Sequence, residues 1–474
     1  MNQLLRLRFV LYTTLLLTFH FSAEVSAQSS GHPGLDTLLM NTLDSMRTVL
    51  GAKSLNAAIQ FPDTAVWADA SGISSVSMPA NTNQAYLIGS VTKTITTACI
   101  LQLVDAGTLS LDDSLHEWLD TIQYVNPDLT IRQLLRHQSG LYDVLNNPVF
   151  NTAMNNNPGF TWSADSMVNY YLLPPTGTPG GSWNYCNTNY FLLGMIIEAA
   201  TGNPFYVEYR NRFFNNYGYS SFGIPSFEPY PQPVAHVWID TNGDGILDDA
   251  HNSYFPFNAL NSAAGAAGGF YATASDLTRW TRTYLRGDVA SPAMMTEAQT
   301  MINASGSQGG KYGLGLMRNT FQGLTAYGHG GDLGYAASSW YFPARDISIS
   351  VLMNHNGLTS WNLLPVVNAL LKTYNDWLLT TSIGQSAQNA AVSVFPNPFT
   401  DQIHLTLNNA YFNGQPEVVL QNAMGQTLLT GKYMTSTNNG YSITLDGLSY
   451  LPSGMYIVRV TAEGEVISTG KVIR

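Results

Sequence analysis

The hydrophobic pattern of the chain changes once, near residue 380, and this change divides the chain into two parts. Up to residue 378, helical and alternating periods occur in mixed order, whereas beyond residue 391 only short alternating segments remain. The intervening residues 380–391 are small and polar, as is typical of a linker. Because each period buries its own kind of face, the pattern predicts a mixed domain over residues 31–379 and an all-β domain over 392–474.

The order of elements in the first part indicates an α+β fold. The periods predict helices at residues 35–50, 92–106, 130–136, 189–201 and 360–378, and strands at 56–61, 65–70, 338–342 and 348–353. The last two strands are joined by Pro343-Ala344-Arg345-Asp346, which favours an antiparallel hairpin. We expect the final helix to lie across that sheet, with a helical insertion in the middle of the domain.

The second part predicts a small β-sandwich. Its alternating segments are separated by Gly, Asn and Pro, and they lie at Gln402–Leu407, Val418–Asn422, Ser442–Leu445, Met455–Val460 and Val466–Ile473. Several short strands at this spacing are typical of two packed antiparallel sheets.

The N-terminus has the features of a signal peptide, predicted over residues 1–27. Arg6 and Arg8 precede an apolar run over 9–21, and Val25-Ser26-Ala27 supplies small residues for cleavage. The run is short for a membrane-spanning helix, and no later segment offers about 20 unbroken apolar residues. We therefore expect an exported protein with no transmembrane segment in its mature form.

Charge and cysteine content narrow the function classes. The formal net charge is -11 without a basic cluster, which argues against nucleic acid and anionic membranes as partners. The two cysteines, Cys99 and Cys186, are too few for a disulfide-built scaffold. They could pair after export, but two small buried side chains are the favoured interpretation.

A Ser-x-x-Lys pair occurs twice, and its local structure separates the two cases. Ser90 and Lys93 open a predicted helix, where residues three apart share a face. Ser468 and Lys471 lie in an alternating segment, where residues three apart point to opposite faces. Only the first pair can bring an amine to a hydroxyl, so Ser90 is the candidate nucleophile. Lys93 would act as a base if neutral or as an electrostatic anchor if charged, and the sequence leaves this open.

Two further segments carry candidate site residues. Tyr185 and Asn187 flank Cys186 in a loop ahead of a helix, so that Tyr185 could exchange the Ser90 proton and Asn187 could bind a substrate carbonyl. His329-Gly330-Gly331 lies at the edge of a strand, where glycines let a substrate backbone approach. The backbone N–H groups of Ser90 and of Asp332 are the predicted oxyanion donors.

These three elements, in this order, resemble the serine β-lactamase and penicillin-binding-protein family, in its class C-like branch. The resemblance extends to Leu87–Lys93, Leu101–Asp113, Thr130–Leu141 and Ala267–Leu277, and it covers roughly residues 35–378. It implies an antiparallel sheet flanked by helices with a helical subdomain. It also implies that Ser90 is the nucleophile, that Lys93 and Tyr185 handle protons, and that Asn187, His329 and Gly331 bind substrate.

The resemblance implies an acyl-Ser90 enzyme that hydrolyses amide or ester bonds of a small-molecule or peptide substrate without a required cofactor. D-Amino-acid peptidases, carboxypeptidases and esterases remain open, and the alternatives are a true β-lactamase or a catalytically silent penicillin- or peptidoglycan-binding protein. This chain departs from the family by carrying His329 where Lys is usual and Gly330 where Ser or Thr is usual. The second departure removes a hydroxyl that often contacts a substrate carboxylate.

A separate loop has the spacing of a calcium site. Asp240, Asn242, Asp244 and Asp248 stand at loop positions 1, 3, 5 and 9, and Gly245 stands at position 6. The closing Glu expected at position 12 is His251. A structural calcium and a solvated turn are equally compatible with this pattern.

The tail resembles the C-terminal sorting domain of type IX secretion. The similarity rests on Val394–Phe399, on Leu448–Val458 and on the final Gly470–Arg474. It implies the type IX secretion machinery as a partner, passage across the outer membrane, and a secreted or surface-attached product. A carbohydrate-binding sandwich is the alternative, and it would require a row of exposed aromatic side chains.

Overall fold

The computed structural model describes residues 28–251, 257–388, 392–408, 415–422, 426–431, 434–437, 440–452, 454–462 and 465–474. The predicted signal peptide, residues 1–27, lies outside the described residues.

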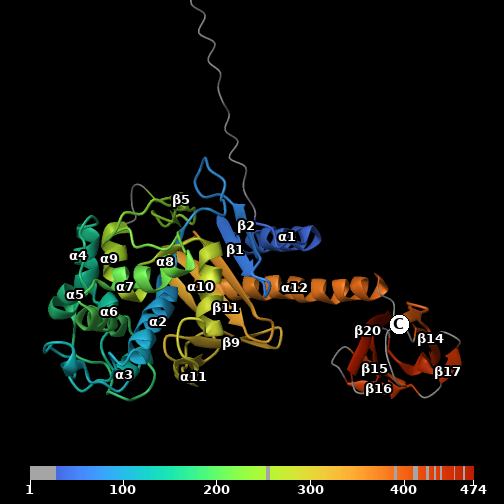
Figure 1. Ribbon diagram of the computed structural model, residues 1–474. Coiled ribbons are helices and arrows are strands. Elements are labelled where there is room, and N and C mark those ends of the chain that lie inside the picture. The colour runs from blue at the N-terminus through green and yellow to red at the C-terminus, as the bar shows by residue number, and fades with distance from the viewer. Residues whose placement is uncertain are drawn as a thin grey trace, which may run out of the picture.

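The larger domain is built on an antiparallel sheet of eight strands in the order β2-β1-β12-β11-β10-β9-β8-β7 (Figure 1). The strands are β1 (Ser54–Gln60), β2 (Val66–Gly72), β7 (Ile302–Asn303), β8 (Lys311–Tyr312), β9 (Met317–Phe321), β10 (Leu324–Leu333), β11 (Tyr335–Phe342) and β12 (Ile347–Met353). Pairing of β1 with β12 joins the two ends of the domain in one sheet.

Helices cover both faces of this sheet. Helices α1 (Pro33–Leu50) and α12 (Ser360–Gln388) pack together on one face, and α10 (Ala274–Arg286) packs on the other. Every residue of β1, β11 and β12 is buried, as strands covered on both faces require. The predicted hairpin and the final helix across the sheet are confirmed.

The predicted linker is wrong for most of its length, because α12 continues to Gln388. The small polar residues from Thr380 onward lack a strong helix signal of their own. A helix that is already nucleated gains one hydrogen bond for each residue added, so a weak sequence can prolong it. Residues 389–391 lie outside the described residues.

A helical region lies between β2 and β9 in the chain, beside the sheet (Figure 1). Its helices include α2 (Thr92–Asp105), α3 (Ile131–Leu135), α4 (Pro148–Asn156), α5 (Ala164–Tyr171), α6 (Thr188–Thr201), α7 (Phe205–Tyr209), α8 (Asn215–Tyr217), α9 (Phe257–Gly268) and α11 (Pro292–Ala298). Helices α2 and α6 are buried on nearly all sides and form its centre. The α+β class with a helical insertion is thereby confirmed.

The C-terminal domain consists of two four-stranded sheets, β13-β14-β18-β17 and β16-β15-β19-β20, with one apolar core. The strands are β13 (Val392–Phe395), β14 (Ile403–Asn408), β15 (Pro416–Asn422), β16 (Thr427–Thr430), β17 (Met434–Thr437), β18 (Gly440–Leu445), β19 (Met455–Ala462) and β20 (Glu465–Ile473). The predicted small sandwich is confirmed.

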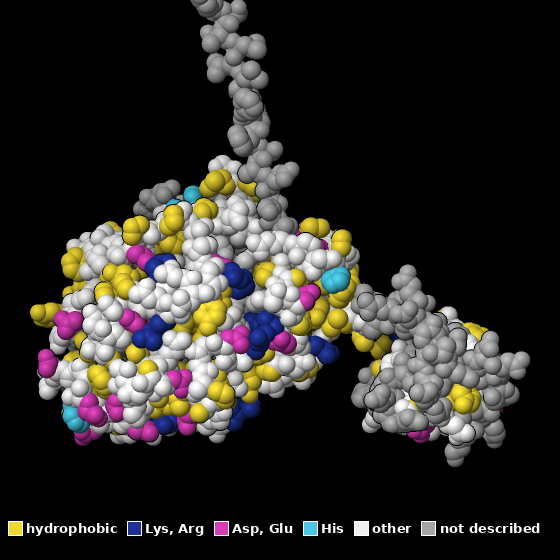
Figure 2. All heavy atoms as spheres, viewed as in Figure 1, with side chains coloured by type: hydrophobic (Ala, Val, Ile, Leu, Met, Phe, Trp, Pro, Cys, Tyr) yellow, Lys and Arg dark blue, Asp and Glu magenta, His cyan; other side chains and the backbone are white. Residues whose placement is uncertain are grey.

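The surface charge and the character of the helices bear on two of the sequence predictions. On the face of the larger domain shown in Figure 2, Lys and Arg side chains are interspersed with Asp and Glu side chains. Among the helices within the described residues, none combines the length and the apolar character needed to cross a membrane.

Candidate active site

The candidate nucleophile lies on a single turn, η1 (Gly89–Val91), directly ahead of α2. The preceding strand β3 (Tyr86–Leu87) pairs with β6 (Tyr271–Ala272), and the N–H of Ile88 donates to the carbonyl oxygen of Phe270 at 2.9 Å. Gly89 turns the chain with φ of 52°, in the left-handed region that favours glycine. The pairing with β6 therefore fixes where the serine turn begins.

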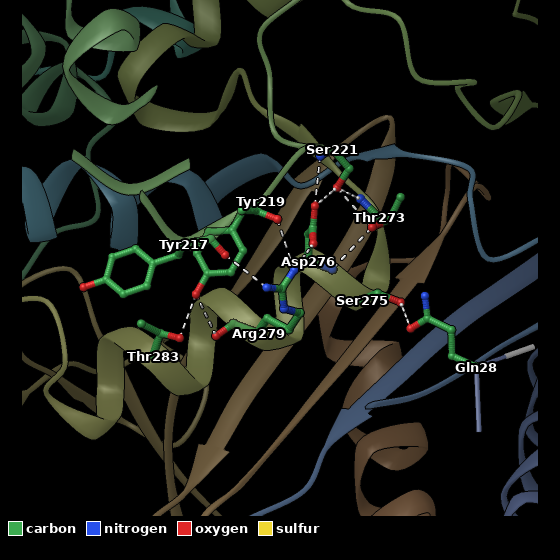
Figure 3. Close-up of polar contacts among 10 residues, drawn as sticks. Gln28, Tyr217, Tyr219, Ser221, Thr273, Ser275, Asp276, Arg279 and Thr283 are labelled. Atoms are coloured by element: carbon green, nitrogen blue, oxygen red, sulfur yellow. Dashed lines mark hydrogen bonds and ion pairs between the residues drawn. The ribbon is translucent and has the colours of Figure 1, made fainter. Parts of the chain in front are cut away.

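A polar network holds β6 in place (Figure 3). Thr273 caps α10 by accepting a hydrogen bond from the N–H of Asp276 at 3.3 Å. The Asp276 carboxylate in turn accepts from the N–H and the hydroxyl of Ser221, at 2.9 and 2.8 Å, and pairs with Arg279 at 2.9 Å. These contacts give a structural role to Thr273 and Asp276 in the block Ala267–Leu277.

Lys93 is fully buried and its amine is surrounded by three oxygen atoms. Nζ lies 3.0 Å from Ser90 Oγ, 2.8 Å from Asn187 Oδ1 and 2.8 Å from the carbonyl oxygen of Ala267. Burial lowers the pKa of Lys93 to about 7, although the Asp143 carboxylate opposes this shift. Neither the amide oxygen nor the carbonyl oxygen can donate, so a neutral amine gives its two hydrogens to them and turns its lone pair to Ser90.

Tyr185 approaches the same hydroxyl group. The Ser90 side chain acts on its phenol so as to lower the phenol's pKa, and the centroid of its ring lies 4.9 Å from Nζ of Lys93. Burial raises the pKa of Tyr185 well above its ordinary value, and the nearby carboxylates of Asp143 and Asp332 add to this shift. The phenol therefore keeps its proton at neutral pH. The Lys93 ammonium loses its own proton more readily.

Asn187 is oriented by Asp143, a residue that the sequence interpretation missed. Asp143 Oδ2 accepts from the backbone N–H of Asn187 at 2.9 Å and from its Nδ2 at 2.8 Å. These bonds fix the amide so that its oxygen faces Lys93, and one Nδ2 hydrogen remains for a substrate. In the structure Asp143 also accepts from the N–H of Leu145 at 3.0 Å, as turn-initiating Asp residues commonly do.

The two predicted oxyanion donors lie where strand β10 meets the serine turn. Pairing of β10 with β9 ends at Gly328, and the strand beyond it packs against η1. A Cβ atom on Gly331 would collide with the carbonyl oxygen of Ile88 and lie 2.8 Å from the N of Ser90. A Cβ atom on Gly89 would lie 2.7 Å from the N of Asp332. Only glycines permit this approach, and it brings the N–H groups of Ser90 and Asp332 together.

His329 does not present a free nitrogen to the site, contrary to what its predicted role as a substrate ligand requires. Its side chain is buried, with Nε2 3.0 Å from Tyr312 Oη and Nδ1 2.5 Å from the carbonyl oxygen of Gly330. Burial lowers the pKa of His329 to about 3, with Lys93 contributing, so the ring is neutral near pH 7. Both nitrogens are used within the protein.

The chain of hydrogen bonds continues to His137, which the sequence analysis did not name as a site residue. His137 is fully buried, with Nε2 3.2 Å from Tyr312 Oη, and Nδ1 accepts from the N–H of Cys186 at 3.1 Å. Because Nδ1 accepts, Nε2 carries the hydrogen and donates to Tyr312, whose hydroxyl then donates to His329. The tautomers of both histidines are thereby fixed.

His137 also contacts the loop that carries Tyr185, through both its backbone and its ring. Its carbonyl oxygen accepts from the N–H of Asn184 at 2.9 Å, and its ring centroid lies 4.3 Å from that of Tyr185. One sequence signal could have identified it, its place in the block Thr130–Leu141. In the structure its φ of 56° is uncommon for a residue other than glycine.

The candidate calcium ligands lie in a separate loop. The Asp240 carboxylate accepts hydrogen bonds from the N–H groups of Gly243, Asp244 and Gly245 in an exposed turn. Within the described residues, no group of three or more His, Cys, Asp or Glu side chains is arranged to hold a metal ion, so the calcium site stays a prediction. Cys99 and Cys186 are both free and buried.

Comparison with known families gives two matches along the chain. The model described as Beta-lactamase matches residues 57–370, and that described as Secretion system C-terminal sorting domain matches residues 393–474. The first range contains all the residues that surround Ser90 in the structure.

Two curated relatives cover the larger domain. The chain is 26% identical to Penicillin-binding protein 4* of Bacillus subtilis over 274 residues, which are 54% of this chain and 58% of that protein. It is 25% identical to a D-aminopeptidase of Cereibacter sphaeroides over 280 residues, 58% of this chain and 51% of the relative. The chain thus spans little more than half the length of these relatives.

Solved structures show the same fold. A D-stereospecific amidohydrolase from Streptomyces sp. has a TM-score of 0.60 and 26% identity, covering 69% of this chain and 97% of that one. The D-amino acid amidase from Ochrobactrum anthropi has a TM-score of 0.65 and 23% identity, covering 72% and 99%. Taken with the match over residues 57–370, these similarities establish that the chain belongs to the Beta-lactamase family of serine hydrolases and carries a type IX secretion sorting domain, which implies export.

Proposed function

We propose that the protein hydrolyses amide or ester bonds through an acyl-Ser90 intermediate and that its substrates are small D-amino-acid derivatives. The observation that carries the proposal is the convergence of two proton-handling groups, Lys93 and Tyr185, on the Ser90 hydroxyl. A serine hydroxyl needs such a neighbour to become a nucleophile at neutral pH.

Acylation follows from the contacts of Lys93. The neutral amine takes the proton of the Ser90 hydroxyl as Oγ forms a bond to the substrate carbonyl carbon. The carbonyl oxygen becomes an oxyanion and accepts from the N–H groups of Ser90 and Asp332. When the C–N or C–O bond breaks, Tyr185 donates its proton to the leaving group and is reprotonated from Lys93.

Deacylation reverses these roles with water as the nucleophile. Lys93, again neutral, takes a proton from water as the water oxygen bonds to the acyl carbon, and Ser90 Oγ leaves with a proton. Asn187, held by Asp143, keeps one amide hydrogen for a substrate carbonyl. No step requires a cofactor.

The choice among substrate classes rests on the names of relatives and on Gly330. Relatives and neighbours include D-aminopeptidase and D-amino acid amidase, which supports amides of D-amino acids as substrates. Carboxypeptidase activity has less support, since Gly330 offers no hydroxyl to a substrate carboxylate. An esterase is the second candidate, because esters need no such contact.

Export by a signal peptide, cleaved near Ala27, belongs to the same proposal. The sorting domain would then engage the type IX secretion machinery and deliver the enzyme to the surface or the medium.

A serine-directed probe tests the nucleophile. A fluorophosphonate should label the mature protein, and Ser90→Ala should abolish the labelling, whereas Ser468→Ala, in the second Ser-x-x-Lys match, should not. Parallel assays on a D-amino-acid amide, a p-nitrophenyl ester, a D-Ala-D-Ala peptide and nitrocefin would identify the reaction. Undiminished labelling of Ser90→Ala would refute the assignment, and labelling without turnover would favour a silent binding protein.

A further inference from the structure

We propose that a cavity in the helical region binds a small organic ammonium compound at a site separate from Ser90. The cavity lies among α5, α6, α7 and α9, which Figure 1 shows together to one side of the sheet. Its volume is about 280 Å³, close to the lower end of the range for small-molecule sites, about 300–1,000 Å³. None of the described residues that line it belongs to those that surround the Ser90 hydroxyl.

Two glycines and one phenylalanine shape the space between α6 and α9. A Cβ atom on Gly194 of α6 would lie 3.9 Å from Cδ1 of Phe205, and one on Gly265 of α9 would lie 3.9 Å from Cζ of the same ring. The Phe205 ring therefore lies across both helices at van der Waals distance. Both glycines line the cavity, so the absence of a side chain at these positions contributes directly to its volume.

Aromatic rings form one wall of the cavity. Tyr206 and Phe227 stack with their ring centroids 5.5 Å apart, and Phe205 meets them edge-on at 5.7 and 6.0 Å. All three side chains line the cavity, and all three are only partly buried. Because the face of an aromatic ring attracts a cation, a wall of this kind is suited to an organic ammonium group.

A carboxylate without a cationic partner lies in the same lining. Oε1 of Glu198, in the last turns of α6, accepts from the backbone N–H of Phe205 at 3.2 Å. Burial raises the pKa of Glu198, and no Lys or Arg among the described residues acts on it. Asp165 adds a second carboxylate, and the described residues that line the cavity include no Lys or Arg. The charge of the lining therefore attracts an ammonium group and repels an anion.

The rest of the lining determines the body of the bound molecule. Met167, Phe191 and Ala263 are buried and apolar, whereas Ser163 and Asp165 at the start of α5 are exposed. The cavity thus has an apolar floor and opens to solvent beside a carboxylate. An ammonium group on an apolar body, as in an arylalkylamine, matches both parts.

The test measures binding of three compounds of similar size to the full-length mature protein by calorimetry. At neutral pH, 2-phenylethylamine is cationic, 2-phenylethanol is neutral and phenylacetate is anionic. We expect affinity to fall in that order, with the amine binding about tenfold more tightly than the alcohol. Protein whose Ser90 has been blocked with a fluorophosphonate should bind the amine equally well. Calorimetry needs no turnover, so the result does not depend on the proposed hydrolase activity.

Two variants locate the site, each with a matched control. Glu198→Gln should weaken binding of the amine about tenfold and leave binding of the alcohol unchanged, whereas Glu417→Gln, at an exposed position of β15, should change neither. Ala164→Phe adds a ring to the cavity lining and should abolish binding of both compounds. Ala199→Phe, at an exposed position of α6 outside the lining, should not. Thermal unfolding would show that each variant is folded.

Three results would overturn the ammonium site and leave the hydrolase assignment intact. The first is equal affinity for 2-phenylethylamine and phenylacetate, or no binding of the amine at all. The second is unchanged amine binding in folded Glu198→Gln and Ala164→Phe. The third is loss of amine binding after fluorophosphonate treatment, which would place the compound at Ser90. Absence of fluorophosphonate labelling and of turnover in the wild type, with amine binding retained, would overturn the hydrolase assignment alone.

Discussion

The amine of Lys93 lies 2.8 Å from the carbonyl oxygen of Ala267, a residue 174 positions further along the chain. A non-helical Gly265, with φ of 41° and ψ of -126°, interrupts α9 just before this contact. Ala266 and Ala267 lie in the last turn of α9, where carbonyl groups have no partner within the helix, and the Thr96 hydroxyl donates to the carbonyl oxygen of Ala266 at 2.6 Å. One end of α9 therefore orients the group that would activate Ser90.

Activity should depend on pH through Lys93. The lysine accepts the Ser90 proton only when neutral, so kcat/KM for a neutral ester should fall as pH drops through about 7, the pKa of Lys93. Asp143 raises that pKa, and Asp143→Asn should therefore move the acidic limb to lower pH. Asp112→Asn, which removes an exposed carboxylate paired with Arg132, should not move it. An unshifted limb in Asp143→Asn would contradict the assignment of Lys93 as the base.

Tyr185→Phe should reduce kcat by about 10²-fold or more while leaving the fold intact. The change removes the hydroxyl that interacts with Ser90 but keeps the ring that packs on His137. Tyr124→Phe is the matched control, since Tyr124 also stands two residues before an asparagine, Asn126, and is exposed. Steady-state kinetics and thermal unfolding would be measured together, and nearly unchanged kcat in Tyr185→Phe would remove Tyr185 from the mechanism.

The two glycines after His329 should respond differently to alanine. At Gly331 the new methyl meets backbone atoms of Ile88 and Ser90, which cannot move without displacing the serine turn. At Gly330 it meets side-chain atoms of Ser360 and Gln308, which can shift. We expect Gly331→Ala to lose about 100-fold in kcat, as for loss of an oxyanion donor, and Gly330→Ala to lose much less. Equal losses of kcat in the two variants would mean that the backbone of β10 does not meet the backbone of the serine turn at Gly331.

His137→Ala should lower both stability and activity more than Tyr312→Phe. The first change leaves the buried N–H of Cys186 without its acceptor, which lowers the free energy of unfolding by about 1–3 kcal/mol. It also removes a contact of the loop that carries Tyr185. The second change keeps the bond to Cys186 but removes the hydroxyl that links Nε2 of His137 to Nε2 of His329. Urea unfolding and kcat would be measured for both variants. A larger loss in Tyr312→Phe than in His137→Ala would show that these hydrogen bonds act chiefly on His329 rather than on the loop of Tyr185.

Local periodicity was enough for the helices and strands at the two ends of the larger domain, for several sandwich strands and for the nucleophile, but it did not predict α4, α5, α9 or α10. Ser90 and Lys93 share a helix face because they are three residues apart at a helix start, a relation that the sequence alone contains. The hairpin of β11 and β12 and the sandwich strands follow in the same way from alternation and turn residues. The end of α12 could not be read locally, because helix propagation depends on the turns already formed.

The sequence by itself determined the fold class, the two domains and the identity of Ser90, Lys93 and Tyr185 as candidates. Only the tertiary structure decided that Asp143 orients Asn187, that His137 holds the Tyr185 loop, that both nitrogens of His329 are used within the protein, and that Ala267 binds Lys93. The physical reason is that most of these contacts join distant segments through one or two hydrogen bonds. A backbone carbonyl such as that of Ala267 carries no side-chain signature, so its role appears only when the chain is folded.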